Sequence, residues 1–269
     1  SVSSYSGVIG DVAGNTAGAA SGDLGAVIID TTAPVITVIP GTDTVEQGSI
    51  WVDAGATSDG GEDIFVEGTV DINTAGTYTI TYTATDTAGN TGMASRTVNV
   101  VAIAVGDLRA GGVVFWLDST GQHGLVVAFS DVATSVEWGC FGTDLPNVPN
   151  VPWNGGNPVG LGARIGDGES NTVTIALACP TAPAALAARS LGAQWFLPSA
   201  KELNQIYINK TTLEGVNGFN GFNGNGFSNL YWSSSEYDSN NAWGQNFANG
   251  SQNDNSKTNG YNVRAVRAF

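Results

Sequence analysis

The sequence predicts two domains, an all-β sandwich followed by an α+β domain. Its 37 glycines and 9 prolines among 269 residues form a share typical of turn-rich β structure. Residues 77–85 alternate between Thr on one face and apolar side chains on the other, as in a half-buried strand. Helix signals occur only after residue 180. The length itself allows two domains of roughly 150 residues each.

The composition indicates a folded, acidic chain, because 42% of the residues are hydrophobic and only 12% are charged. The net charge of −15 would repel phosphate backbones, so nucleic acid and anionic membranes are poor partners. Arg96 is the single basic residue of positions 1–102. A lone histidine, His123, speaks against a histidine-built metal site or histidine-dependent catalysis. No run approaches the ~20 apolar residues of a membrane helix, so we expect no membrane insertion.

The N-terminal part contains an internal repeat, because Asp11–Thr16 resembles Asp86–Thr91. Between the copies we expect short strands at Val35–Ile39, Ile64–Val66 and Thr77–Thr85. The Asp-Thr-Ala-Gly-Asn segment after the last strand supplies a hairpin turn, since Gly and Asn tolerate positive φ.

Three segments of this part carry a resemblance: Asp30–Thr37 at the start of a module, and Ala75–Tyr82 with Thr85–Asn90 at its end. They resemble the immunoglobulin-like repeats of large bacterial surface adhesins. The resemblance implies an immunoglobulin-like module over residues 31–102 that serves as a stalk, with residues 1–30 closing a preceding module. The acidity of this part leads us to expect Ca²⁺ at the module junctions, held by Asp30 and Asp86.

Residues 103–269 predict an α+β domain with a long irregular stretch over residues 138–172. One helix is expected over Ala182–Leu191, before Gly192. A second is expected after Ser199, which forms a capping box with Glu202. The expected strands are Val113–Leu117, Leu125–Phe129, Tyr231–Ser234, Trp243–Phe247 and Val263–Phe269.

Several motifs of this domain carry a second resemblance, namely Trp138–Cys140, Gly168–Thr172, Trp195–Ser199, Glu202–Asn204, Tyr231–Tyr237, Ala242–Trp243, Asn246–Phe247 and Val263–Arg267. In this order they resemble the C-type-lectin-like domain that ends bacterial collagen-like adhesins. The resemblance implies a twisted sheet with two helices. That broad fold serves carbohydrate binding, protein binding and sulfatase-activating oxidation, so it does not determine function. At their strand spacing, Trp232 and Trp243 are expected in the core.

A calcium and sugar site is expected at two segments of this domain. Calcium-dependent C-type lectins place a Glu-Pro-Asn triplet and a later Asn-Asp pair around one ion, and Glu236-Tyr237-Asp238 and Asn253-Asp254 resemble these segments in order. Ca²⁺ takes 6–8 oxygen ligands and accepts vicinal sugar hydroxyls. The resemblance therefore implies Glu236, Asp238, Asn253 and Asp254 as metal ligands, and the same residues with Asn240 as the glycan-binding set. Tyr237 replaces the proline of the family. The alternative interpretation is that both segments are hydrophilic turns.

The identity of the sugar is indicated only by the first residue of the triplet. Because this residue is Glu236, the resemblance to the lectin triplet implies a fucose or mannose type over galactose. Cys140 and Cys179 form an even pair in a chain that has the composition of a secreted protein, so we expect a disulfide between them.

Sulfatase-activating oxidases of this broad fold use a pair of reactive cysteines, and Cys140 and Cys179 could be proposed for that role. No base or metal cluster accompanies either of them in the sequence, so we expect that the chain is not an enzyme.

The sequence thus predicts an extracellular fragment of a bacterial cell-surface adhesin, monomeric within a longer chain. Its immunoglobulin-like repeat presents a lectin-like head that binds cell-surface glycans through Ca²⁺. Two alternatives remain: a head that binds protein or peptide without a metal, and a purely structural module. No signal peptide is visible and residue 1 is Ser, so we expect a piece of a longer chain.

Overall fold

The computed structural model describes residues 29–222 and 229–269. The expected end of a preceding module, residues 1–30, lies almost entirely outside the described residues. The described chain forms two units. One holds residues 29–45 and 49–101, and the other holds Glu46–Gly48 with Ala102–Phe269.

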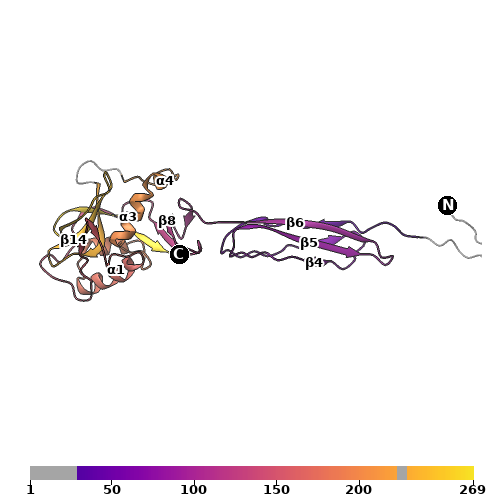
Figure 1. The fold of residues 1–269 in the computed structure, drawn as a ribbon, viewed down its shortest axis with the longest axis horizontal. Helices are drawn as coiled ribbons and strands as arrows, with labels where there is room; N and C mark the ends of the chain where they lie inside the picture. Colours follow the sequence, from indigo (N-terminus) through magenta and orange to yellow (C-terminus); the bar gives the residue numbers. More distant parts are fainter. Residues whose placement is uncertain (1–28, 223–228) are drawn as a thin grey trace, which may run out of the picture. The chain divides into compact units, whose positions relative to one another are not determined.

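The described residues of the N-terminal unit form two sheets, in which the β1/β3, β4/β5 and β5/β6 pairs are antiparallel. Its strands are β1 (Ile36–Val38), β2 (Thr44–Glu46), β3 (Ala56–Ser58), β4 (Phe65–Glu67), β5 (Gly76–Thr85) and β6 (Thr91–Val101). Strands β1 and β3 pair with each other, and the second sheet has the order β2-β6-β5-β4. The long hairpin of β5 and β6 dominates this unit (Figure 1).

The β5–β6 hairpin follows the alternation that the sequence predicts. Ile80, Tyr82 and Ala84 of β5 are buried, whereas the threonines between them face outward or lie partly buried. The side-chain period of a strand is two, so one face supplies the core and the other stays polar. The carboxylate of Asp86 accepts the N–H groups of Ala88 and Asn90 and closes the turn as expected.

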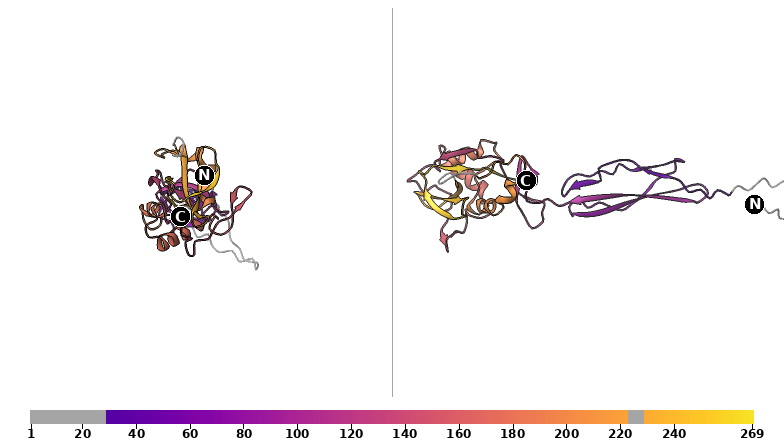
Figure 2. Two further views of the ribbon diagram at one scale, coloured as in Figure 1. Left: turned by 90° about the vertical axis from the view of Figure 1, so that its left-hand side faces the viewer. Right: turned by 90° about the horizontal axis from the view of Figure 1, so that it is seen from above.

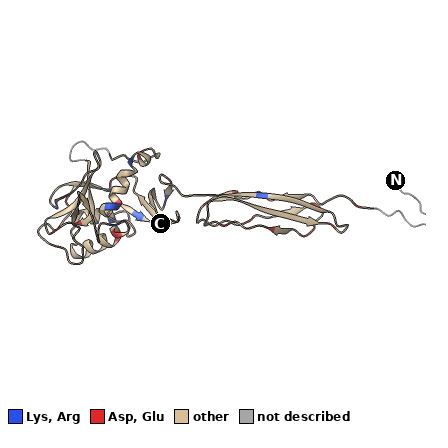
Figure 3. Ribbon diagram, in the orientation of Figure 1, with Lys and Arg blue, Asp and Glu red and all other residues tan. Residues whose placement is uncertain are grey.

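Arg96 joins the two sheets of the N-terminal unit through a buried polar network. Its guanidinium donates to Asp43 at 2.7 Å and to the Tyr82 hydroxyl at 3.2 Å, and it lies 3.3 Å from Asp53. It also donates to the carbonyl of Ile39. Because Arg96 is the only Lys or Arg of residues 1–102, its charge is held inside while acidic side chains remain on the surface. The remaining basic residues belong to the C-terminal unit (Figure 3).

The described residues of the C-terminal unit form two larger sheets, a small hairpin and four helices (Figures 1 and 2). Its strands are β7 (Leu108–Arg109), β8 (Gly112–Leu117), β9 (Gly124–Val127), β10 (Ala133–Val136), β11 (Trp153–Asn154), β12 (Asn157–Pro158), β13 (Leu230–Glu236), β14 (Asn241–Asn246), β15 (Gln252–Ser256), β16 (Tyr261–Val263) and β17 (Val266–Ala268). The helices are α1 (Asp167–Ala178), α2 (Pro183–Arg189), α3 (Ala200–Ile208) and α4 (Lys210–Glu214). The sheets have the orders β10-β16-β13-β14-β15, β17-β9-β8-β7 and β11-β12.

The sheet of β8 and β9 lies between two hydrophobic cores. Val113 and Phe115 belong to one core, and Val114, on the opposite face of β8, belongs to the other. Burial on both faces explains why the sequence shows uninterrupted apolar runs here instead of alternation. Trp232 and Trp243 are fully buried, which confirms their expected place in the core.

Helix α1 corrects the prediction of an irregular stretch over residues 138–172, because it begins at Asp167. Its first turns contain glycine, serine, asparagine and threonine, which have low helix propensity. Long-range contacts stabilise it instead. The Asn171 amide donates to the carbonyl of Gly162 and to Ser234, and the Thr172 hydroxyl bonds with the backbone of Leu197.

Two strand predictions near the C-terminus are also corrected. Asn253 and Asp254 were expected in a loop, but they lie in β15, the edge strand paired with β14. The single strand expected over Val263–Phe269 is divided into β16 and β17, which belong to different sheets. The chain crosses between the sheets at Arg264 and Ala265, where the buried Arg264 side chain bonds to Asp131 at 2.6 Å.

Candidate functional site

Glu236, the first expected calcium ligand, is the last residue of β13 and points into the protein. Its side chain is fully buried and forms an ion pair with the equally buried Lys257. One carboxylate oxygen, Oε1, also accepts the N–H of Leu145 at 3.4 Å. Burial raises the pKa of the Glu236 carboxyl, and the Lys257 ammonium opposes this shift. Glu236 is therefore paired with a protein cation.

Asp238 and Asn240 lie in the turn between β13 and β14. The Asp238 carboxylate accepts the backbone N–H groups of Asn240 and Asn241 at 2.8 and 2.7 Å, and the Asn241 amide as well. Burial would raise the pKa of Asp238, but these donors outweigh it and lower the pKa below its usual value. Asn240 is exposed. Asp238 thus closes a turn, which is the alternative interpretation of this segment.

Asn253 and Asp254 extend along β15. Asp254 pairs across the sheet with Trp243 of β14. Its oxygen Oδ1 accepts the indole N–H of Trp153 at 2.9 Å. Asn253 is exposed, and its amide lies 3.5 Å from the hydroxyl of Ser251. Asp254 therefore lies beside the ring of Trp153, whereas Asn253, its neighbour in the strand, points to the opposite side of the sheet.

The residues present do not fit a calcium ion held by Glu236. The Lys257 ammonium already neutralises the Glu236 carboxylate through Oε1, and Asp238 and Asp254 each satisfy donors of the protein. Over residues 29–222 and 229–269, no three His, Cys, Asp or Glu side chains gather in a way that could hold a metal ion. The fucose or mannose preference depended on an accessible Glu236, so its burial removes that argument.

The acidic residues expected at the module junction lie around a pocket of the N-terminal unit. Asp30 and Asp86 line this open pocket of about 780 Å³, together with Glu62 and Asp63. The carboxylate of Asp86 is engaged by the Asn90 amide and by backbone N–H groups of its own turn. Calcium at this position stays a prediction.

An exposed aromatic platform lies next to Asp254, and we call it the Trp153 face. It consists of Trp153, Tyr237 and Asp254. Trp153 belongs to the hairpin of β11 and β12, and 38% of it is exposed. Its ring lies on the buried ring of Trp243, with centroids 4.8 Å apart, and Tyr237 meets the same ring edge-on at 6.0 Å. The indole is thus held by a ring contact and by the hydrogen bond to Asp254.

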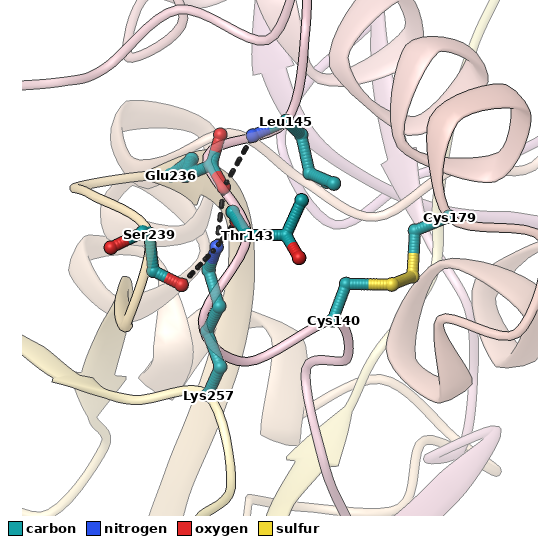
Figure 4. Close-up of a disulfide and its surroundings, with 7 residues drawn as sticks. All are labelled: Cys140, Thr143, Leu145, Cys179, Glu236, Ser239 and Lys257. Atoms are coloured by element: carbon teal, nitrogen blue, oxygen red, sulfur yellow. Dashed lines mark hydrogen bonds and ion pairs between the residues drawn. A yellow bond between two sulfur atoms is a disulfide. The ribbon is translucent and has the colours of Figure 1, made fainter.

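The predicted disulfide is confirmed. Cys140 and Cys179 are bonded, with Cα atoms 6.2 Å apart. The bridge joins the loop 139–145 to the residue that ends α1. Figure 4 shows this loop passing from Cys140 to Thr143 and Leu145, beside Glu236 and Lys257. The disulfide therefore anchors the loop that borders the ion pair.

Comparison with known proteins identifies both units. A family model described as the Lcl C-terminal domain matches residues 128–267, more than half of the chain. The chain belongs to the Lcl C-terminal domain family. A second model, described as the Ig-like domain of a bacterial surface protein, matches residues 37–100. The chain is therefore a cell-surface adhesion module with an immunoglobulin-like unit, and both families are of the surface adhesin type rather than enzymes.

Two further comparisons complete this description. A fimbrial protein from Bacteroides ovatus ATCC 8483 has a solved structure that aligns over 88% of this chain and 71% of its own, with 14% identity and a TM-score of 0.44. No curated protein matches the chain. Among the described residues, no helix has the length and apolar character needed to cross a membrane.

Two residues of the Lcl C-terminal domain were missed as members of the candidate site. Trp153 stands directly before Asn-Gly-Gly-Asn, and an aromatic residue beside a tight turn could have signalled an exposed ring. Lys257 carries no comparable signal. It is one of only nine Lys and Arg residues, but its pairing with Glu236 depends on a contact across 21 positions.

Glu202 links two helices of the Lcl C-terminal domain. The predicted capping box is present, because Glu202 accepts the N–H of Ser199 at 2.7 Å while the Ser199 hydroxyl accepts that of Glu202. Its other oxygen accepts the N–H of Gly166 at the start of α1. A Cβ at Gly168 would stand 2.2 Å from the Glu202 carboxylate, so glycine is required for this approach. Burial raises the pKa of Glu202 to about 7.

The raised pKa of Glu202 predicts that stability falls as pH rises. The pKa of this carboxyl is higher in the folded chain than in the unfolded chain, where it lies near 4.5, so the folded state binds the proton more tightly. The resulting stabilisation is fully present below pH 4.5. This contribution, about 3 kcal/mol, is lost as pH rises from 4.5 to about 7. Urea unfolding from pH 4.5 to above 7 should therefore show the stability difference between wild type and Glu202→Gln shrinking. Parallel pH profiles for the two proteins would contradict the prediction.

Proposed function

We propose that the C-terminal unit binds neutral cell-surface glycans through the Trp153 face, without a bound metal, and that the immunoglobulin-like unit serves as its spacer. The observation that carries the proposal is the exposed indole of Trp153, held in place by Asp254 at 2.9 Å. The membership of both units in surface adhesin families supports a role in adhesion.

The Trp153 ring has the properties of a stacking platform. The C–H face of a pyranose is apolar and packs against an indole, which offers a large, flat surface. Trp243 supports Trp153 from inside, and the Asp254 hydrogen bond removes much of the freedom of the ring. A side chain that is ordered before binding loses little entropy when a ligand arrives, which favours affinity.

The polar groups around the ring suit sugar hydroxyls. The carboxylate of Asp254 accepts hydrogen bonds, and the hydroxyl of Tyr237 both donates and accepts. A hydroxyl group likewise donates and accepts, so the two sets are complementary. Asp254 is acidic, and neither Trp153 nor Tyr237 carries a charge. This charge balance disfavours sulfated and sialylated glycans, and so the proposal names neutral ones.

A glycan array with the whole chain tests the proposal. Wild type should retain neutral glycans equally in calcium and in excess chelator. Trp153→Ala should weaken binding of the best glycan at least tenfold, which corresponds to about 1.4 kcal/mol of lost contact. Phe141→Ala is the matched control, because Phe141 is also an aromatic residue of this unit and is 55% exposed. Its affinity should equal that of wild type.

Two variants of Asp254 separate the metal-free mechanism from a calcium mechanism. Asp254→Asn keeps an oxygen that can accept the Trp153 N–H, so binding should stay within a few-fold of wild type. Asp254→Ala removes the acceptor and should weaken binding strongly. Calcium ligation would require the charge, and both variants would then fail. Retention of no glycan by wild type, or equal affinity in wild type and Trp153→Ala, would overturn the proposal.

A further inference from the structure

The side chain of Lys257 is fully enclosed in the C-terminal unit, directly after β15. Its backbone joins two neighbouring segments, since its N–H donates to the carbonyl of Asn240 at 2.9 Å and its carbonyl accepts the N–H of Trp138 at 3.0 Å. Burial of a charged lysine is costly unless each of its N–H donors and its charge are compensated. The buried Lys257 ammonium therefore needs hydrogen-bond acceptors and a compensating charge close by.

Three oxygens and one aromatic ring surround the Lys257 ammonium. It donates to Oε1 of Glu236, to the carbonyl of Thr143 at 3.0 Å and to the carbonyl of Ser239 at 3.2 Å. An ammonium has three N–H donors, so these three acceptors satisfy all of them. The ring of Trp138 lies 4.8 Å from the nitrogen and adds a cation–π contact. Figure 4 shows Glu236, Thr143 and Ser239 converging on this nitrogen from separate segments.

This set of partners has the chemistry of a hard-cation site. A carboxylate and two backbone carbonyls are oxygen ligands of the kind that Ca²⁺ selects, and they come from β13, from the loop 139–145 and from the turn 237–240. Ca²⁺ would require about 6–8 oxygens. Three oxygens and an indole face suit an ammonium instead.

We propose that the Lys257 ammonium is a built-in cation that holds the loop 139–145 and the turn 237–240 against β13. These segments of the C-terminal unit therefore need no calcium ion to hold them together. Lys257 acts as a positioning residue for these segments. Lys257 thereby determines the order and stability of the C-terminal unit, whichever ligand the Trp153 face binds.

Thermal unfolding of the whole chain is the first test. The unfolding transition of the C-terminal unit, followed by tryptophan fluorescence, should have the same Tm in millimolar calcium chloride and in excess chelator. Lys257→Ala should lower the Tm by roughly 10 °C, because it leaves the Glu236 carboxylate buried without its partner. Added ethylammonium chloride should restore part of that loss in Lys257→Ala, since the small amine returns the missing cation to its space. Lys257→Met fills the same space and should gain nothing from the amine.

A double-mutant cycle keeps the proposal testable if Lys257→Ala does not fold. Glu236→Gln combined with Lys257→Met removes both charges at nearly constant volume, so the double variant should be more stable than the sum of the single losses predicts. Amide exchange should show the loop 139–145 and the turn 237–240 opening first in each folded single variant. Additive losses in the cycle, or a calcium-dependent rise in the wild-type Tm that Glu236→Gln abolishes, would overturn the proposal.

Discussion

Substitution of Arg264 by methionine should destabilise the C-terminal unit by about 3–5 kcal/mol, the usual effect of removing one partner from a buried ion pair. Its guanidinium bonds to Asp131 at 2.6 Å and donates to the carbonyls of Ala128, Phe129 and Asn220. The ring of Phe222 lies 4.5 Å from it. Methionine replaces none of these bonds and leaves buried acceptors without donors.

Guanidinium unfolding followed by tryptophan fluorescence measures this loss. Six of the seven tryptophans lie after residue 103, so the signal reports mainly on the C-terminal unit. Arg164→Met removes the same charge from an exposed position and should change stability by less than about 0.5 kcal/mol. Arg264→Lys keeps the charge but loses the planar fork, so its stability should fall between the two. Equal midpoints for Arg264→Met and Arg164→Met would show that the buried network contributes nothing measurable.

Loss of the Cys140–Cys179 disulfide should cost the C-terminal unit roughly 3–4 kcal/mol. The bridge spans 39 positions, and closing a loop of that length restricts the unfolded chain by about this amount in the chain-entropy model. The effect should also reach the Lys257 site, because the same loop supplies the Thr143 carbonyl. The measurement is guanidinium unfolding of wild type with and without reductant, beside the Cys140→Ala/Cys179→Ala double variant.

The controls for the disulfide follow from its chemistry. The double variant should unfold at the midpoint of reduced wild type and should not respond to reductant. Amide exchange of Leu145 should accelerate when the bridge is reduced, since its N–H bonds to Glu236 at the edge of the anchored loop. Equal stability of the oxidised and reduced proteins would show that the loop stays ordered without the bridge.

The candidate site was predictable only in part. The resemblance directed attention to Glu236, Asp238 and Asp254, and the structure places Asp254 at the Trp153 face. The partners of these residues were not predictable, because they are distant in sequence. Trp153 reaches Asp254 across 101 positions, and Lys257 reaches Glu236 across 21. A pattern of residue types does not reveal whether a carboxylate will face a lysine, a turn or a solvent-exposed ring.

The sequence by itself determined the elements whose stabilising contacts are local. The alternation of β5, the apolar runs of β8 and β9 and the capping box of α3 all arise from neighbours within a few residues, and the structure contains them. Tertiary structure decided the rest. Helix α1 forms against propensity because Glu202 and the core satisfy its groups. Lys257 pairs with Glu236 because three segments converge on its ammonium, and only the folded chain brings those oxygens together.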